Sequence, residues 1–131
     1  MKNIIPEIYV INCKEALEFY KEAFGGEIKN VQTGAGKPMF KDFEDKIIHS
    51  ELHINDYCTL YFVDMFEEIP KGKDIHIVLE FDSEEEITKA YYALSKGGNV
   101  KFELQKTFWG ALHAVVTDCH GNTWGLNYTV Q

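Results

Sequence analysis

One short segment holds three side chains that can bind a metal ion or move a proton. His49, Glu51 and His53 are spaced two residues apart, so in a β-strand they lie on the same face. Imidazole and carboxylate groups are ligands for Zn, Ni, Fe or Mn, and both serve as general acids or bases. Neighbouring same-face residues of a strand are about 7 Å apart, so all three reach one ion only if the strand bends or bulges. The segment therefore predicts either a metal site or a solvated polar strand face.

Two glutamates and one more histidine extend this set of chemically competent residues. Glu7 and Glu80 lie in the two predicted strands that precede the two predicted helices. A carboxylate on a partly apolar face can act as a general base, so we predict both as catalytic residues, the alternative being exposed surface carboxylates. His76 is a candidate metal ligand, for which His49, Glu51 and His53 are candidate partners.

Five further side chains are candidate contacts for a small ligand. Aromatic rings stack on flat molecules, and phenol, imidazole and amide groups form hydrogen bonds with polar ones. The predicted ligand-binding residues are Tyr9, Tyr61, Trp109, His113 and Asn127. The alternative for the aromatic members is packing in the core or at a contact between two subunits.

Composition limits the classes of partner. The 131 residues are 45% hydrophobic and 26% charged, with a net charge of −8, a profile typical of one soluble domain. The negative charge disfavours nucleic acid and anionic membranes as partners. No uninterrupted run of 18 apolar residues occurs, and the three cysteines form no CxxC pair, so we expect reduced thiols and a cytoplasmic protein.

The chain contains one internal repeat. An amphipathic helical pattern begins after Asn12 and ends at Gly25, and a second begins after Asp82 or Ser83 and ends at Gly97. Asn and Ser are favoured N-cap residues, and glycine commonly follows the last turn of a helix. The two glycines lie 72 positions apart, since 97 minus 25 is 72, and a strand-like segment follows each. Two copies of one folding unit are the simplest explanation.

Each copy is predicted to contain one strand, one helix and three more strands, in that order. Alternating apolar residues place the predicted strands at 4–11, 27–33, 46–54 and 57–64 in the first copy, and at 75–81, 99–105, 109–118 and 122–130 in the second. We therefore predict a single α+β domain over 1–131, with a first βαβββ module (1–68), a linker (69–74) and a second βαβββ module (75–131). Polar residues on the helix-free side of the strands predict a concave, ligand-binding sheet.

Several motifs resemble the vicinal oxygen chelate superfamily, which includes glyoxalase I, bleomycin-resistance proteins and extradiol dioxygenases, and within it the PhnB-like branch. The matching segments are PEIYV (6–10), EALEFYKEAFGGEI (15–28), GG (97–98), TFWG (107–110), TD (117–118), Gly121 and WGLN (124–127). The resemblance implies two βαβββ modules that form an open eight-stranded cup with helices on its outer face, and a homodimer.

The same resemblance allows each metal-ligand position of the superfamily to be checked in this chain. The corresponding residues are Ile5, Tyr61, His76 and Gly125, and only His76 is a common ligand. We therefore predict a protein that binds a small organic molecule in its concave sheet. One possibility is a lyase or isomerase in which Glu7 or Glu80 is the base and His76, with or without a metal, polarises a carbonyl oxygen. A second is a non-catalytic binding protein of the bleomycin-resistance type, and a third is a scaffold whose outer edges pair with another protein.

Overall fold

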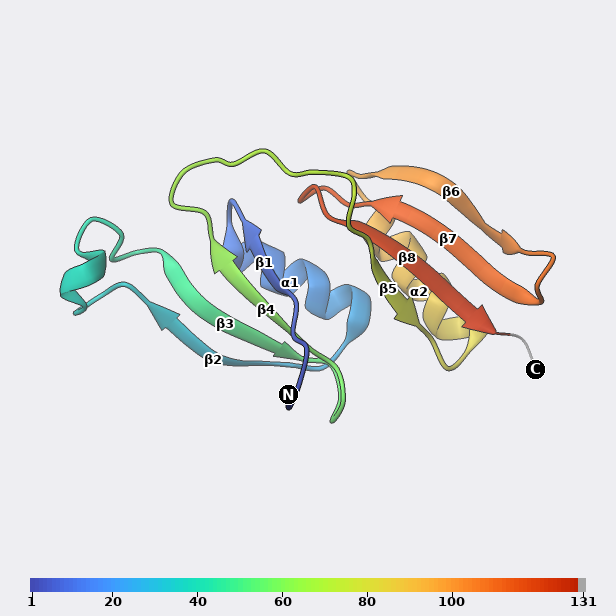
Figure 1. The fold of residues 1–131 in the computed structure, drawn as a ribbon, viewed down its shortest axis with the longest axis horizontal. Coiled ribbons are helices and arrows are strands. Elements are labelled where there is room, and N and C mark those ends of the chain that lie inside the picture. Colours follow the sequence, from blue (N-terminus) through green and yellow to red (C-terminus); the bar gives the residue numbers. More distant parts are fainter. Residues whose placement is uncertain (130–131) are drawn as a thin grey trace. The chain divides into compact units, whose positions relative to one another are not determined.

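The computed structural model describes residues 1–129, so the end of the last predicted strand, Val130, lies outside the described residues. The chain divides into two compact units, Met1–Ile69 and Pro70–Gln131. Each unit contains one helix and one four-stranded sheet (Figure 1). Within the described residues, no helix is long and apolar enough to cross a membrane.

The first unit is a βαβββ module with one added turn of 3-10 helix. Its elements are β1 (Glu7–Val10), α1 (Cys13–Phe24), β2 (Glu27–Thr33), η1 (Pro38–Phe40), β3 (Ile47–His53) and β4 (Thr59–Asp64). The strand order is β1-β4-β3-β2. Strand β1 pairs with β4 in parallel, and the other two pairs are antiparallel.

The second unit repeats this topology. Its elements are β5 (Ile77–Glu80), α2 (Glu84–Ser95), β6 (Asn99–Lys106), β7 (Ala111–Thr117) and β8 (Thr123–Thr129). The strand order is β5-β8-β7-β6, with a parallel pair between β5 and β8 and antiparallel pairs elsewhere. Both sheets are open, because each has two edge strands. The predicted α+β class with two βαβββ modules is confirmed.

Both helices begin and end close to the predicted residues. Asn12 caps α1 by accepting the Glu15 N–H at 3.3 Å, and Ser83, not Asp82, caps α2 by accepting the Glu86 N–H at 3.1 Å. Gly25 ends α1, and Gly97 follows the C-cap of α2 with a φ of +69°. The local signals for capping were sufficient because they act within one turn of the chain.

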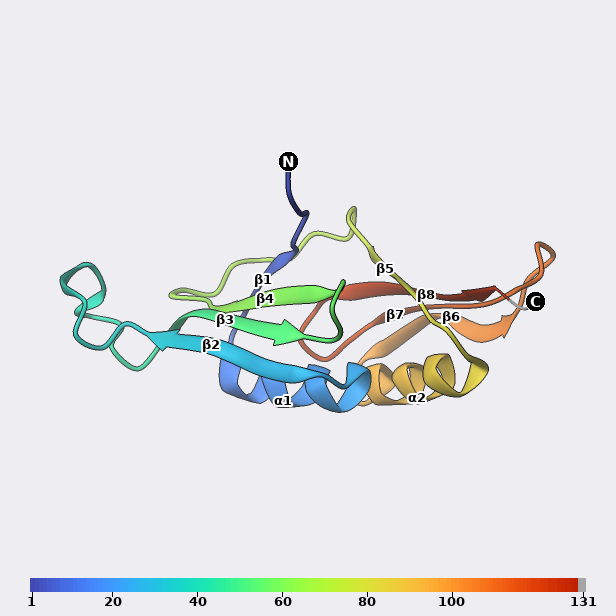
Figure 2. The same ribbon diagram turned by 90° about the horizontal axis from the view of Figure 1, so that it is seen from below.

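Each helix covers one face of its own sheet and leaves the other face uncovered by a helix (Figure 2). In the first unit, Tyr20 of α1 stacks on Phe62 of β4 with ring centroids 4.8 Å apart, and both side chains are fully buried. In the second unit, Ile87 and Leu94 of α2 are buried, as is Trp124 of β8. This burial supplies the main driving force for folding of each unit.

Three predicted strands are shorter than expected by three or four residues. The 4–11 strand is reduced to β1 because only Glu7–Val10 pairs with β4, and Pro6 has no N–H to extend the ladder. The 75–81 strand is reduced to β5, so His76 precedes the strand and is exposed. The 109–118 strand begins at Ala111, because the Gly110 N–H donates to the Thr107 carbonyl and closes a turn.

Candidate functional site

The helix-free face of the first sheet carries a row of four polar side chains. Strand register places Glu7 opposite Tyr61, Tyr61 opposite Glu51, and Glu51 opposite Lys29. Directly opposite residues share a face of the sheet, so the row crosses all four strands. Ile8 and Phe62, which alternate with members of this row, are buried on the helix side. Glu7 and Glu51 therefore lie on the helix-free face, as the alternation along their strands predicted.

At the centre of this face, one carboxylate accepts hydrogen bonds from two imidazoles. The Nε2 atom of His49 lies 2.6 Å from Glu51 Oε2, and the Nε2 atom of His53 lies 2.6 Å from Glu51 Oε1. Asn30 adds a third bond from Nδ2 to Oε1 at 3.1 Å. The Tyr61 ring packs edge-on against His49, with ring centroids 4.8 Å apart. We call His49, Glu51 and His53 the imidazole–carboxylate cluster.

The hydrogen bonds of this cluster keep Glu51 ionised. Those from His49 and His53 lower the pKa of Glu51 from 4.5 to about 2, with a smaller contribution from Asn30 that acts against burial of the carboxylate. A carboxylate that accepts several hydrogen bonds is favoured in its charged form. Glu51 is therefore a fixed negative charge at neutral pH and does not itself exchange protons there.

The ionised carboxylate also determines which ring nitrogens carry hydrogen. An ionised carboxylate only accepts hydrogen bonds, so Nε2 of His49 and of His53 must each be the donor. In a neutral imidazole, the Nδ1 lone pair is then the one that can accept a proton. A base held in one tautomer by a third group is the arrangement on which many general bases rely.

A hollow of about 360 Å³ lies beside His53 in the first unit. It is polar, and its lining residues are Gly26, Glu27, Lys29, His53, Ile54, Asn55 and Asp56. Lys29 lies 3.7 Å from Glu27 in an exposed ion pair. The volume is within the range that small-molecule sites occupy, so the hollow gives the imidazole of His53 room for a ligand of a few heavy atoms.

The helix-free face of the second sheet has a different polar row. Register places Gln105 opposite His113, His113 opposite Asn127, and Asn127 opposite Glu80. The Asn127 amide Nδ2 donates to both carboxylate oxygens of Glu80 at 2.9 Å. Glu80 is therefore engaged by a neighbouring strand, whereas the Nδ1 atom of His113 is buried and has no hydrogen-bond partner.

Aromatic rings surround His113. Its ring centroid is 5.7 Å from that of Trp109 and 5.5 Å from that of Phe102. Trp109 lies in the turn before β7 and is half exposed, and Phe108 packs edge-on against it at 4.9 Å. The structure thus brings the predicted residues Trp109, His113 and Asn127 to one region of the second unit, and Tyr61 to the imidazole–carboxylate cluster in the first. Their roles in ligand binding stay predictions, as does that of the half-exposed Tyr9.

The metal-ligand positions of the vicinal oxygen chelate pattern do not supply a donor set in this chain. Ile5 and Gly125 have no donor atom in their side chains, Tyr61 offers only a phenol, and His76 is an exposed residue outside β5. Over residues 1–129, no group of three or more His, Cys, Asp or Glu side chains is arranged to hold a metal ion. The residues at these four positions do not fit the superfamily's metal. A divalent ion at His76 or at the imidazole–carboxylate cluster stays a prediction.

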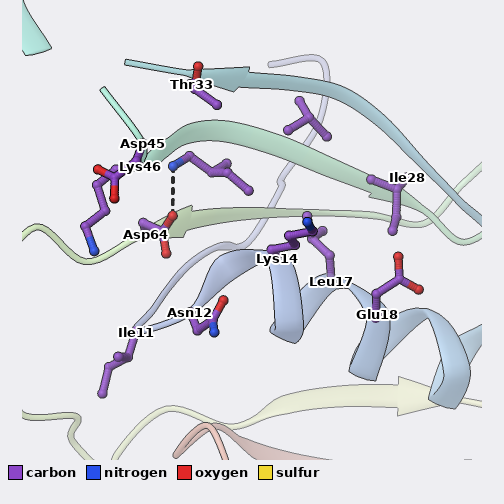
Figure 3. A pocket seen from close by; sticks show the side chains of 12 residues that line it. Ile11, Asn12, Lys14, Leu17, Glu18, Ile28, Thr33, Asp45, Lys46 and Asp64 are labelled. Carbon is purple, nitrogen blue, oxygen red and sulfur yellow. Dashed lines mark hydrogen bonds between the residues drawn. The ribbon is translucent and has the colours of Figure 1, made fainter. Parts of the chain in front are cut away.

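A larger hollow lies on the helix side of the first sheet, away from the predicted residues (Figure 3). Its volume is about 760 Å³, and the start of α1, β2 and the start of β3 line it. Asp64 at its edge accepts the Cys13 N–H at 2.8 Å and the Ile47 N–H at 2.7 Å, one on each carboxylate oxygen. Asp64 of β4 therefore links α1 and β3 through its two carboxylate oxygens. Because both oxygens already accept buried backbone N–H groups, we do not assign Asp64 a role as a general base.

The structure adds two residues that the sequence pattern did not reveal. Asn30 has a positive φ of 53° at a register shift between β2 and β3, and this irregularity directs its amide to Glu51. Lys29 faces the hollow beside His53. The bulge has no local sequence signature, although Asn is among the few residues that adopt a positive φ readily.

A model of the Glyoxalase/Bleomycin resistance protein/Dioxygenase superfamily matches residues 5–126. The chain belongs to this superfamily, so the resemblance predicted from the sequence is confirmed. It is 27% identical over 135 residues to Protein YjdN of Escherichia coli (strain K12), covering 92% of this chain and 90% of that protein.

Solved structures agree with this assignment. The crystal structure of protein PA1353 from Pseudomonas aeruginosa has a TM-score of 0.87 and 30% sequence identity, covering 98% of both chains. A second structure, titled putative 3-demethylubiquinone-9 3-methyltransferase, PhnB protein, from Bacillus cereus, has a TM-score of 0.80 at 18% identity, covering 98% of this chain and 100% of that one. The likeness to this second structure shows a shared fold.

Proposed function

We propose that this protein binds a small polar organic molecule beside His53 and transfers a proton on it, as a lyase- or isomerase-type enzyme. The observation that carries the proposal is the pair of 2.6 Å hydrogen bonds by which Glu51 holds both imidazoles, one of which lines the hollow of the first unit. A nitrogen base, a carboxylate that orients it and an adjacent cavity are the parts that general base catalysis needs.

In this proposal His53 is the catalytic residue and Glu51 is a positioning residue. The Nδ1 atom of His53 takes a proton from a carbon next to a carbonyl group. The electron pair of the broken C–H bond forms a C=C bond, and the π pair of the carbonyl group moves onto its oxygen. The ammonium group of Lys29, in the same hollow, stabilises the resulting enolate. Glu51 stabilises the imidazolium that forms, and return of the proton to another atom of the substrate completes an isomerisation. Glu7 and Glu80 stay predictions as bases, and Glu80 would first have to leave Asn127.

The protonation state can be tested without knowing the substrate. Long-range proton–nitrogen NMR of the neutral histidine rings should show hydrogen on Nε2 of both His49 and His53. In the Glu51→Gln variant this preference should weaken, because the amide can donate as well as accept. A neutral His53 with its hydrogen on Nδ1 would remove the proposed base.

Catalysis can be tested by exchange of substrate protons with deuterium oxide. Hydroxyacetone, pyruvate and acetoacetate are small carbonyl compounds whose exchangeable protons are followed by proton NMR. We expect enzyme-dependent exchange for at least one of them, with a loss of about 100-fold or more in His53→Gln. His120→Gln is the matched control, because it removes an imidazole from the turn between β7 and β8 of the second unit, outside the cluster. Exchange rates equal in the wild type and His53→Gln for all three compounds would contradict the proposal.

A non-catalytic binding protein is the second candidate. It is favoured by the side chains at three of the four superfamily ligand positions, because Ile5, Tyr61 and Gly125 do not form a metal-based catalytic centre. This alternative predicts that a bound compound raises the melting temperature by mass action and is recovered unchanged. Any converted product would exclude it.

We further propose a cytoplasmic homodimer. Large apolar side chains are exposed on the single chain, including Ile4 at 85% and Ile75 at 77%, and contact with a second copy would remove such surface from water. Cys13 and Cys58 are free thiols, a state that suits a reducing compartment. Light scattering should give twice the 15.1 kDa chain mass. A monomer at micromolar concentration would contradict the dimer.

A further inference from the structure

The helix-free face of the second unit presents a group of aromatic side chains with one polar atom among them. Phe102 and Trp109 contact the His113 ring with centroids 5.5 and 5.7 Å away, and Phe108 packs on Trp109 at 4.9 Å. We call these three rings the aromatic ledge. Trp109 is 54% exposed and Phe102 is 40% exposed. Exposed rings at the same place as a buried polar atom are typical of surfaces that a ligand covers.

The polar atom is Nδ1 of His113, which is buried and has no hydrogen-bond partner. Buried polar atoms in folded proteins nearly always have a partner, and one without a protein partner calls for a specific explanation. In the tautomer that carries its hydrogen on Nε2, this nitrogen is an acceptor. A bound molecule that donates a hydrogen bond to it would satisfy the atom.

The neighbouring side chains offer acceptors as well. A carboxylate only accepts hydrogen bonds, so the Asn127 amide must turn its Nδ2 hydrogens towards Glu80, to whose two oxygens it is bonded at 2.9 Å. The Asn127 oxygen is then the part of the amide that remains as an acceptor, and Asn127 lies directly opposite His113 in the sheet. His113, Asn127 and Glu80 therefore form a row of acceptors across β7, β8 and β5.

From this arrangement we propose that the second unit binds a flat aromatic nitrogen compound that carries N–H donors. The ring of the ligand stacks on the aromatic ledge, and its N–H groups donate to His113 Nδ1 and to the Asn127 oxygen. Glu80 and the net charge of −8 favour a neutral or cationic ligand over an anion. The site uses residues of the second unit alone, so failure of this proposal and failure of proton transfer at His53 can be told apart by experiment.

Two small compounds with one ring system test the role of the donors. The first is 2-aminobenzimidazole, and the second is its fully N-methylated analogue, which has the same rings and no N–H group when neutral. Binding is followed by the fluorescence of Trp109, because the only other tryptophan, Trp124, is fully buried. At a pH where both compounds are neutral, the methylated compound should bind about 5- to 10-fold more weakly, the effect of losing one or two hydrogen bonds.

Variants assign this effect to particular atoms. His113→Phe keeps a ring against Trp109 and Phe102 and removes the acceptor, so it should weaken binding of 2-aminobenzimidazole about 5-fold and leave the methylated compound unaffected. Glu80→Gln should weaken binding about 2- to 3-fold. Glu85→Gln is the matched control for charge, because Glu85 is exposed on α2, which packs on the other face of the sheet, and it should have no effect.

The nitrogen NMR signal of His113 Nδ1 in the wild-type protein is a direct measurement that needs no variant. Addition of 2-aminobenzimidazole should shift this signal in the direction expected for an accepted hydrogen bond, and the methylated compound should not. Three results would overturn the proposal: no binding of 2-aminobenzimidazole up to about 10 mM, equal affinity of the two compounds, or unchanged affinity in a folded His113→Phe variant.

Discussion

The two units share a scaffold and differ on the face that no helix covers. His113, Val115 and Thr117 each lie 64 positions after a residue of the imidazole–carboxylate cluster, since 113 minus 49, 115 minus 51 and 117 minus 53 all equal 64. The register agrees, because Tyr61 lies opposite Glu51 and Gly125, again 64 positions on, lies opposite Val115. Both units thus have a histidine at the first of these positions, His49 or His113, and only the first unit has a carboxylate, Glu51, at the second.

This substitution removes the carboxylate that binds the imidazole Nε2 in the first unit, and it is separate from the burial of Nδ1 in His113. In the first unit Glu51 accepts the His49 hydrogen bond, and in the second unit Val115 offers no acceptor to His113. The cross-strand neighbour of Val115 is Phe102, where the first unit has Lys29 opposite Glu51. The helix-free face of the first unit therefore carries a charged, hydrogen-bonded cluster, and that of the second unit carries an aromatic surface. The two sheets have the same topology.

The largest effect is expected where the scaffold is common to both units. A Cβ on Gly26 would lie 2.3 Å from the His53 carbonyl oxygen, and one on Gly98 would lie 2.4 Å from that of Thr117. We expect Gly26→Ala and Gly98→Ala each to lower the free energy of unfolding by about 3 kcal/mol, because the backbone must move. Gly36→Ala is the control, since Gly36 has a positive φ of +73° in a turn but no close atom, and it should cost about 1 kcal/mol. Denaturant unfolding measures all three, and equal costs would contradict the steric argument.

A second comparison concerns one buried aspartate in each unit. Asp64 accepts two backbone N–H groups, and Asp118 accepts those of His120 and Asn122 together with the Trp124 indole N–H. Asp64→Ala and Asp118→Ala should each destabilise by about 2 to 4 kcal/mol, because buried donors lose their acceptor. Thermal unfolding measures the loss. A loss below 1 kcal/mol in either unit would mean that water replaces the carboxylate.

Acid should weaken the first unit through Glu51. The folded-state pKa of Glu51 is about 2, against an ordinary value of 4.5, so its stabilisation is present above about pH 4.5 and is lost as the pH falls towards 2. We expect Glu51→Gln to lower stability by about 1 to 3 kcal/mol at neutral pH, after allowance for partial solvation. The difference from the wild type should shrink between pH 4.5 and pH 2. A difference that does not change with pH would show that the charge of Glu51 is not what stabilises the cluster.

The smallest effects are expected at the helix caps. Asn12→Ala and Ser83→Ala each remove a side-chain acceptor for one backbone N–H in the first turn of a helix, which costs about 1 kcal/mol. The two losses should be similar, because the capping geometry is the same in both units. Thermal unfolding of the single and double variants checks this, and a double loss far from the sum would indicate that the two helices are energetically coupled.

Much of the candidate site could be predicted from alternation along single strands. Placing Glu7, Glu51 and Glu80 on helix-free faces needed only the period of two that any strand imposes. The aromatic surroundings of His113 were less predictable, because Phe102 and Trp109 reach it from β6 and from the turn before β7. Alternation along one strand also does not reveal that Asn127, 47 residues from Glu80 in the chain, binds the Glu80 carboxylate.

The repeat, the two capped helices and the strand faces follow from local sequence, because caps, turns and hydrophobic periods act over a few neighbouring residues. The tertiary structure alone decided that His49 and His53 donate to the same carboxylate, that a bulge at Asn30 brings a third donor to it, and that His113 Nδ1 is buried without a partner. Those outcomes depend on strand register, bulges and side-chain rotamers, which are set by contacts between segments far apart in the chain.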